Sequence, residues 1–232
     1  MYNDKHLISL YNRFARSLDS PEAPMNRWLD RNLETGRRAL DIGCGTGRYS
    51  LMLADRYDEV VAVDLAPSMI EIAERDRSRP NISYQVRDVL SMTPERDGVF
   101  DLVLALGCVI NVGPPEVVLD HFRRLTAKNG LLLIMESMWE PGWGTREWQV
   151  NFAFRTARSV WDSTGDLDDV SAVLQVILNP TWLEIAAIDV PLEREAFIHE
   201  YTAALPGATI EEECKRLGLG VFAVSWRAVE RE

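Results

Sequence analysis

One glycine-rich stretch gives the strongest structural signal in the chain, Leu40-Asp41-Ile42-Gly43-Cys44-Gly45-Thr46-Gly47-Arg48. Residues 39–42, which lead into the glycines, are mostly apolar, as in a strand at the centre of a sheet. Residues 49–54 follow with apolar side chains at helical spacing. The glycines therefore lie at a turn from strand to helix. A ligand can approach the backbone there, and the first amides of the helix can face an anion or a carboxylate.

Two familiar nucleotide-binding turns do not match this stretch. A phosphate-binding loop has Lys and then Ser or Thr after its last glycine, and no Lys follows here. A dinucleotide-binding turn has the pattern Gly-x-Gly-x-x-Gly. Counted from Gly43, the last glycine of that pattern falls on Arg48.

The stretch resembles the first motif of class I S-adenosylmethionine-dependent methyltransferases. The core of that motif, (L/V)-D-(I/L)-G-x-G-x-G, is met from Leu40 to Gly47. The alternative is an ordinary tight turn. The resemblance implies that S-adenosyl-L-methionine is the cofactor and that the turn binds it through Asp41, Gly43, Cys44, Gly45, Thr46 and Gly47.

Composition narrows the class of protein. The chain has 232 residues, enough for one α/β domain with additions, and a net charge of -11 from 36 acidic and 25 basic residues. Such a charge disfavours nucleic acids and anionic membranes as partners. No apolar run reaches the roughly 18 residues of a membrane span, and the N-terminus does not resemble a signal peptide. Cys44, Cys108 and Cys214 show no metal-binding spacing, so we expect reduced thiols in a cytoplasmic protein without a metal.

Strand and helix patterns alternate from residue 37 onward. The predicted strands are 38–42, 59–64, 82–87, 99–105 and 130–136, and the predicted helices between them are 46–57, 67–77 and 115–127. This order predicts a doubly wound α/β fold with a parallel sheet. In such sheets ligands bind beyond the carboxyl ends of the strands.

An acidic residue ends the second predicted strand at the place expected for a ribose-binding carboxylate. Asp64 lies 23 positions after Asp41, near the spacing of about 20 found in nucleotide-binding folds. Its two oxygens can accept from both ribose hydroxyls. Leu65 and Met69 follow in the same candidate site. The alternative is a charge that stabilises the next helix.

Further cofactor contacts come from the resemblance. It implies that Asp88 accepts from the adenine amino group and that the backbone of Val89 reaches the ring, although Asp88 also suits a plain turn. Residues 100–103, Phe-Asp-Leu-Val, resemble the fourth methyltransferase motif. In that motif carbonyls around Leu106 would accept from the methionine ammonium.

The N-terminal segment, residues 1–34, is expected to be helical. Residues 11–15, Tyr-Asn-Arg-Phe-Ala, resemble a lid helix that folds over the cofactor in related enzymes, which adds Tyr11 to the cofactor site. The alternative is that these helices only pack on the sheet.

An insertion at about 138–204 interrupts the α/β pattern and is rich in aromatic residues. It is either a pocket for the methyl acceptor or a set of packing elements. Residues 170–178 and 182–188 flank Asn-Pro and predict a hairpin. Residues 196–202 predict a third strand, which would make this an α/β cap. The third strand would carry His199, the best candidate for a general base.

The chain ends with two further elements. Thr209 and Glu212 predict a capped helix that stops at Gly218, and residues 221–226 predict a last strand. This order resembles the end of the methyltransferase fold, whose last strand is antiparallel. We therefore expect a single domain over 1–232 with a mostly parallel, seven-stranded, Rossmann-like sheet.

The expected activity is methyl transfer from S-adenosyl-L-methionine to nitrogen or oxygen of a small organic molecule, with a secondary metabolite or an amino sugar as acceptor. The alternative is a non-catalytic protein that binds the cofactor as a sensor or scaffold. The acceptor would be the main partner. Many enzymes of this kind are homodimers, a property that the sequence itself does not show.

Overall fold

The computed structural model describes residues 5–16, 24–212, 215–216 and 219–229. The chain divides into two compact units. The sheet unit contains residues 34–136, 194–211 and 222–232, and the helical unit contains residues 1–33, 137–193 and 212–221. Each unit is described by itself.

A seven-strand path runs through the sheet in the order β3-β2-β1-β4-β5-β8-β6. The bounds are β1 Gly36–Ile42, β2 Tyr57–Asp64, β3 Ile82–Val86, β4 Phe100–Leu106, β5 Thr126–Ser137, β6 Thr209–Glu211 and β8 Leu219–Arg227. The two-residue strand β7, Lys215–Arg216, pairs with β8 outside this path. The first five strands lie where the sequence predicts them, so the doubly wound sheet is confirmed.

Strands β1 to β5 are parallel, and their carboxyl ends meet at one edge. Asp64 pairs with Val86 at the end of β2 and β3, and Leu106 pairs with Met135 at the end of β4 and β5. Strand β8 runs the other way. Asn129 N donates to Ala228 O, and Met138 N donates to Gly220 O. The residue numbers along β8 therefore decrease as those along β5 increase. The antiparallel last strand is therefore confirmed.

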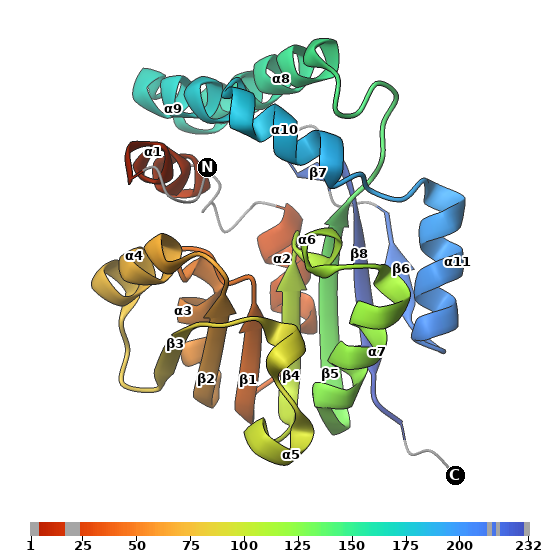
Figure 1. The fold of residues 1–232 in the computed structure, drawn as a ribbon. Coiled ribbons are helices and arrows are strands. Elements are labelled where there is room, and N and C mark those ends of the chain that lie inside the picture. The colour runs from red at the N-terminus through yellow and green to blue at the C-terminus, as the bar shows by residue number, and fades with distance from the viewer. Residues whose placement is uncertain (1–4, 17–23, 213–214, 217–218, 230–232) are drawn as a thin grey trace. The chain divides into compact units, whose positions relative to one another are not determined.

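Six helices and one 3-10 turn belong to the sheet unit as described: α3 Arg48–Ala54, α4 Pro67–Arg77, η1 Val89–Ser91, α5 Pro94–Asp97, α6 Val109–Val112, α7 Pro115–Leu125 and α11 Arg194–Ala204. Figure 1 shows α3 behind β2 and α7 in front of β5, so helices cover both faces. The apolar middles of the strands are consequently sealed, and Leu40, Val60, Leu102 and Leu132 have no exposed surface.

The helical unit has an apolar core of its own. Its helices are α1 Lys5–Arg16, α2 Pro24–Asn32, α8 Arg146–Thr164, α9 Leu167–Ile177 and α10 Pro180–Ile188. Leu7 and Phe14 of α1 are buried in one cluster with Phe152 of α8 and Val173 of α9. Arg13 adds ion pairs from α1 to the start of α9, at 2.7 Å to Asp169 and 3.0 Å to Asp166.

The predicted strands of the insertion are wrong. Residues 170–178 and 182–188 fall in α9 and α10, and residues 196–202 fall in α11, so the described insertion is helical rather than an α/β cap. A short apolar run does not distinguish a strand from a buried helix. The Asn-Pro pair is a helix start: the Asn179 side chain accepts from Thr181 N, and Pro180 occupies the first helical turn.

The predicted helix from Thr209 is also wrong at its start. Residues 209–211 form β6, in which Ile210 pairs with Val224 of β8. Pairing along the edge of the sheet therefore overrides the local capping pattern. Cys214 and Gly218 lie outside the described residues. Across the described part of the chain, only α9 and α10 together, bent by 56°, meet the length and apolarity of a membrane span, and no single helix does.

Candidate cofactor site at the carboxyl edge of the sheet

The glycine turn joins β1 to α3 and has a left-handed backbone at three positions. Gly43, Gly45 and Gly47 have φ angles of 62°, 54° and 81°, a region that side chains disfavour. The turn is closed by backbone bonds, with Cys44 N donating to Val63 O at 3.0 Å and Gly47 N donating to Cys44 O at 2.9 Å. The predicted strand-to-helix turn is confirmed.

The three glycines face different surroundings. A Cβ at Gly43 would lie 2.8 Å from Cys108 Cβ, and one at Gly47 would lie 2.5 Å from Tyr84 Oη. A Cβ at Gly45 would meet no atom within 4 Å. Gly43 and Gly47 are thus required for packing, whereas Gly45 leaves an opening through which a ligand can reach the backbone.

The other two turn residues face inward. Cys44 is 8% exposed, and Thr46 is 4% exposed. The carbonyl of Thr46 accepts from Arg77 Nη1 at 2.9 Å, which holds the turn from behind. Both residues are therefore largely covered by the protein, and their contact with a cofactor stays a prediction.

We expect alanine at the three glycines to separate folding from binding. Gly45→Ala should lower the free energy of unfolding by only about 1 kcal/mol, through its φ angle, yet weaken S-adenosylhomocysteine binding tenfold or more. Gly43→Ala and Gly47→Ala should destabilise the protein by about 1–3 kcal/mol because their Cβ atoms clash. Urea unfolding and calorimetry measure the two effects. Equal stability losses at all three positions would contradict this division.

Asp41 is a buried carboxylate directly before the turn. It is 3% exposed and accepts a hydrogen bond from Ser50 Oγ at 2.6 Å. Burial, against an opposing hydrogen bond from Ser50 and with a smaller contribution from the nearby charge of Asp64, raises the pKa of Asp41 to about 7. Its position in the core suits a group that shapes the turn from below rather than one that touches the ligand.

Asp64 ends β2 and holds the turn from the side. Its Oδ2 accepts from Gly45 N and its Oδ1 from Ala66 N, both at 2.8 Å. Burial raises the pKa of Asp64, and the backbone bonds oppose that shift. Each oxygen has a second lone pair, so the carboxylate can still accept from two hydroxyls. Beside it, Leu65 is 65% exposed and Met69 is 3% exposed, so the Met69 side chain packs in the core.

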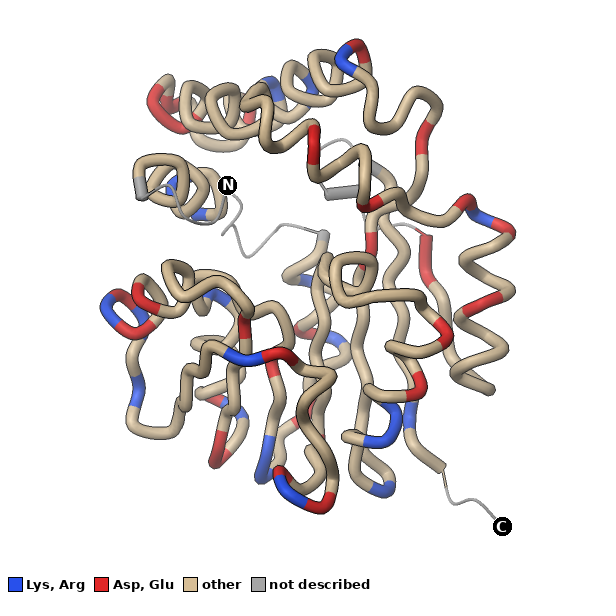
Figure 2. The backbone as a smooth tube through the Cα atoms, viewed as in Figure 1, with Lys and Arg blue, Asp and Glu red and all other residues tan. Residues whose placement is uncertain are grey.

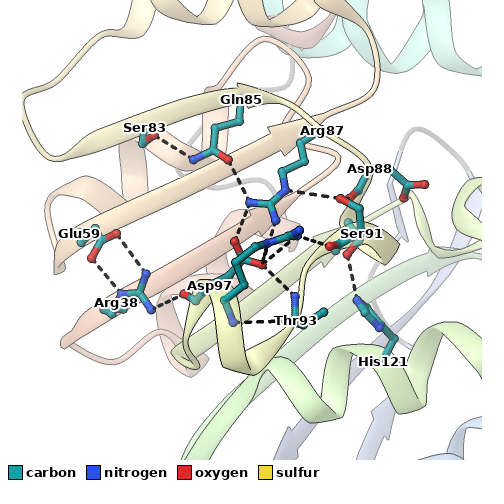
Figure 3. Close-up of polar contacts among 12 residues, drawn as sticks. Arg38, Glu59, Ser83, Gln85, Arg87, Asp88, Ser91, Thr93, Asp97 and His121 are labelled. Carbon is teal, nitrogen blue, oxygen red and sulfur yellow. Dashed lines mark hydrogen bonds and ion pairs between the residues drawn. The ribbon is translucent and has the colours of Figure 1, made fainter.

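The loop after β3 carries the two residues predicted for adenine. Asp88 is exposed, and its Oδ1 accepts from Leu90 N at 2.9 Å. Val89 is buried, and its carbonyl lies 2.9 Å from His121 Nε2 of α7. Figure 3 shows His121 directed at this loop from the helix. His121 thus has a positioning role that its sequence context did not reveal.

An ion-pair network fixes the same loop from below. Asp97 is paired with Arg87 at 2.8 Å and also accepts from Thr93 N at 2.8 Å (Figure 3). The Asp97 carbonyl accepts from Arg38 Nη1 at 3.0 Å. The loop is consequently tied to both its own ends and β1.

Asp97→Asn should destabilise the protein by about 1 kcal/mol at pH 7. The Arg87 hydrogen bond holds the pKa of Asp97 below its usual range. The stabilisation is therefore present above the unfolded-state pKa and lost as pH falls through the folded-state pKa. Urea unfolding between pH 2 and 7 tests this. Asp162→Asn, which removes an exposed pair with Arg158, serves as the control.

The end of β4 brings a third turn to this edge. Leu106 is half-buried, and Gly107, with φ of 70°, donates to Met135 O at 2.6 Å. Glu136 of β5 accepts from the amides that follow. No pattern in the sequence marks a role for this carboxylate, because its partners depend on the conformation of the neighbouring turn.

Carboxylates dominate the charge at this edge of the sheet. Asp41, Asp64, Asp88 and Glu136 all lie within two residues of the carboxyl ends of their strands. In Figure 2, acidic segments lie at the upper edge of the sheet unit beside a few basic ones, and the opposite edge carries segments of both signs, so the negative field at the upper edge comes from these four carboxylates. Such a field disfavours phosphates and favours a ligand that carries an ammonium and a sulfonium. The residues present therefore fit S-adenosylmethionine.

Two predicted site residues do not belong to these strand ends. Tyr11 belongs to the helical unit, where it packs against the apolar core at 6.2 Å from the Phe14 ring, and its place over the cofactor stays a prediction. His199 is exposed on α11, while Phe197 and Tyr201 of the same helix are buried and stacked at 3.8 Å. A strand over 196–202 would place these three alternate residues on one face, but that strand is wrong, so a base role for His199 stays a prediction without structural support.

Comparison with known proteins gives matches among methyltransferases. The methyltransferase domain family matches residues 40–134. A demethylmenaquinone methyltransferase from Beutenbergia cavernae is 34% identical over 164 residues, covering 66% of this chain and 67% of that protein. A ubiquinone biosynthesis O-methyltransferase from Xanthomonas oryzae is 29% identical over 126 residues, covering 50% of this chain and 53% of that protein. The chain thus spans about half the length of that relative.

Solved structures share the fold. The N-methyltransferase NodS from Bradyrhizobium japonicum has a TM-score of 0.55 at 16% identity, covering 91% of this chain and all of that one. An S-adenosylmethionine-dependent methyltransferase from Mesorhizobium loti has a TM-score of 0.59 at 17% identity, covering 89% of this chain and 98% of that one. With the glycine turn and the strand order, these matches show that the chain belongs to the class I S-adenosylmethionine-dependent methyltransferases.

Proposed function

We propose that this enzyme transfers the methyl group of S-adenosylmethionine to a nitrogen or oxygen atom of a small organic molecule. The observation that carries the cofactor half of the proposal is the open backbone at Gly45, next to the carboxylate of Asp64. The acceptor half is supported by the aromatic helical unit.

The cofactor would be held at the ends of four strands, β1 to β4. The Gly45 backbone would approach its amino-acid half, and Asp64 would accept from the ribose hydroxyls. Asp88 and the backbone of Val89 would bind adenine, and the carbonyl of Leu106 would accept from the ammonium. The sulfonium of the bound cofactor supplies a methyl group that is open to in-line displacement. The main task left to the protein is to hold the acceptor in line.

The helical unit carries a stack of aromatic rings, of which Trp148 and Phe152 are 5% and 3% exposed and belong to its core. Trp143 and Trp148 have ring centroids 4.3 Å apart, and Trp148 stacks on Phe152 at 5.3 Å. Trp143 is half-buried, and its Nε1 donates to Ala186 O at 2.9 Å, which fixes the ring. Rigid aromatic rings bind organic molecules with little loss of side-chain entropy. Of these three rings only Trp143 keeps substantial exposed surface, and an acceptor with an apolar or aromatic body fits that ring better than a bare amino sugar does.

Some relatives are methyltransferases named for small organic molecules, which supports this class of acceptor. Among them are the ubiquinone O-methyltransferase and an ajmaline N-methyltransferase from Rauvolfia serpentina, 31% identical over 104 residues. Because both O- and N-methyltransferases occur among the relatives, the reacting atom is left open in the proposal.

A labelled-methyl screen tests the function. The protein is incubated with methyl-labelled S-adenosylmethionine and a panel of phenols, hydroquinones, aromatic amines and amino sugars. We expect label to move to a phenol, hydroquinone or aromatic amine, and Asp64→Ala to abolish most of the transfer at limiting cofactor. Tight cofactor binding with no transfer to any member of the panel would instead favour the non-catalytic sensor or scaffold.

A further inference from the structure

Glu136 is a buried carboxylate at the carboxyl end of β5. Its side chain is 2% exposed, and one oxygen, Oε1, accepts from two successive backbone amides. The donors are Cys108 N at 3.0 Å and Val109 N at 2.7 Å. Hydrogen bonds from amides to a carboxylate are stronger than those between neutral groups, so this pair fixes the backbone after β4.

The fixed segment is the turn that leaves β4. It begins at Leu106 and passes through Gly107, whose positive φ of 70° reverses the chain. Gly107 N donates to Met135 O at 2.6 Å, directly before Glu136 in β5. Two neighbouring residues of β5 therefore hold three successive amides of this turn, those of Gly107, Cys108 and Val109.

Cys108 connects the turn after β4 to the glycine turn. Its Sγ donates to Ile42 O at 3.3 Å, and burial raises the pKa of the thiol, so that it keeps the proton that this bond needs. Its Cβ lies 2.8 Å from the position that a Cβ on Gly43 would occupy. The Cys108 side chain thus packs closely against the start of the glycine turn, and Glu136 fixes the position of the Cys108 backbone.

We propose that Glu136 is a positioning residue for the amino-acid half of the cofactor. By binding the amides of Cys108 and Val109, it sets the carbonyls at the end of β4 and, through Cys108, the start of the glycine turn. This inference rests on the proposed function, in which these two turns bind that half of the cofactor. The residues proposed for ribose and adenine, Asp64 and Asp88, make none of these contacts with Glu136.

Two ligands separate this role from a general structural one. S-Adenosylhomocysteine has both halves, whereas 5′-methylthioadenosine has the nucleoside without the amino-acid part. We expect Glu136→Met to weaken S-adenosylhomocysteine binding about tenfold or more and methylthioadenosine binding less than twofold, since only the first ligand uses the loosened turns. Glu136→Gln should restore the affinity to within about threefold, because its amide oxygen can accept from the same two amides. Calorimetry measures each dissociation constant.

Asp101 provides a matched control at the opposite edge of the sheet. Its Oδ2 also accepts from two successive amides, Arg37 N at 2.8 Å and Arg38 N at 2.9 Å. Asp101→Leu should therefore change the affinity for both ligands by the same factor, whatever it does to stability.

The outcomes are distinct. The proposal is overturned if Glu136→Met and the smaller Glu136→Ala reduce the affinity for both ligands equally. It is also overturned if they abolish the binding of both ligands or leave both affinities unchanged. If the wild-type protein binds methylthioadenosine but not S-adenosylhomocysteine, the proposed cofactor site itself fails. Normal binding of both ligands by the wild type, without any methyl transfer, would remove the proposed function and leave the role of Glu136 intact.

Discussion

Asp64→Ala should weaken the binding of S-adenosylhomocysteine by about 1.5–3 kcal/mol, roughly a 10- to 150-fold rise in the dissociation constant. The variant loses the acceptor proposed for both ribose hydroxyls. It also leaves Gly45 N without the carboxylate that it meets at 2.8 Å. Calorimetry at pH 7.5 measures the change, and circular dichroism checks that the fold is retained.

A ligand without ribose hydroxyls separates these two effects. The 2′,3′-dideoxy analogue of S-adenosylhomocysteine cannot use Asp64, so Asp64→Ala should weaken it only through the loosened glycine turn. The difference between the two ligands gives the ribose contribution, as in a double-mutant cycle. Equal losses for both ligands would show that Asp64 only holds the turn. Unchanged affinity for both would remove Asp64 from the site.

The central sheet was predictable because each of its signals is local. The apolar runs of β1, β2, β4 and β5 are bounded by turns and helical patterns, and their order alone favours a parallel sheet. The carboxyl ends of parallel strands meet at one edge, so Asp64, Asp88 and Leu106 come to the same edge once the order is known.

The insertion was not predictable in the same way. Residues 170–178 are mostly apolar and four of them are β-branched, which suits a strand, yet Asp166 caps the helix that contains them by accepting from Asp168 N at 2.8 Å. Apolar surface from α1 and α8 completes their burial. Helix formation thus depends on residues far away in the sequence, which override the local preference.

The supporting groups of the site were missed because their roles depend on geometry across strands. Glu136 and His121 act on backbone amides or carbonyls of a neighbouring loop, and no spacing in the sequence marks such partners. Asp41 carried a motif signal, but its burial and its bond to Ser50 appear only in the folded chain.

Asp41 gives the prediction with the largest expected effect on stability. Burial raises its pKa from 3.8 to about 7, so the folded protein binds a proton between these pH values that the unfolded chain releases. Stability from this group is therefore fully present below pH 4 and lost as pH rises through about 7. At 1.36 kcal/mol per pKa unit, the loss is at most about 4 kcal/mol.

Asp41→Asn should remove this pH dependence. Asn is neutral at every pH, nearly the same size, and can still accept from Ser50 Oγ. Both proteins are unfolded with urea from pH 4 to 8. Across that range the free energy of unfolding of the variant should increase by up to about 4 kcal/mol relative to that of the wild type. A stability difference that does not change with pH would contradict the raised pKa.

The same variant tests why an unfavourable buried charge is kept beside the glycine turn. If the charge serves the cofactor, Asp41→Asn should be the more stable protein at pH 8 and still bind S-adenosylhomocysteine more weakly. The ammonium of the ligand would favour the ionised carboxylate, so binding to the wild type near pH 6.5 should release a proton that binding to Asp41→Asn does not. Calorimetry in buffers of different ionisation enthalpy measures that proton. Equal proton release by both proteins would assign the charge at Asp41 to the fold alone.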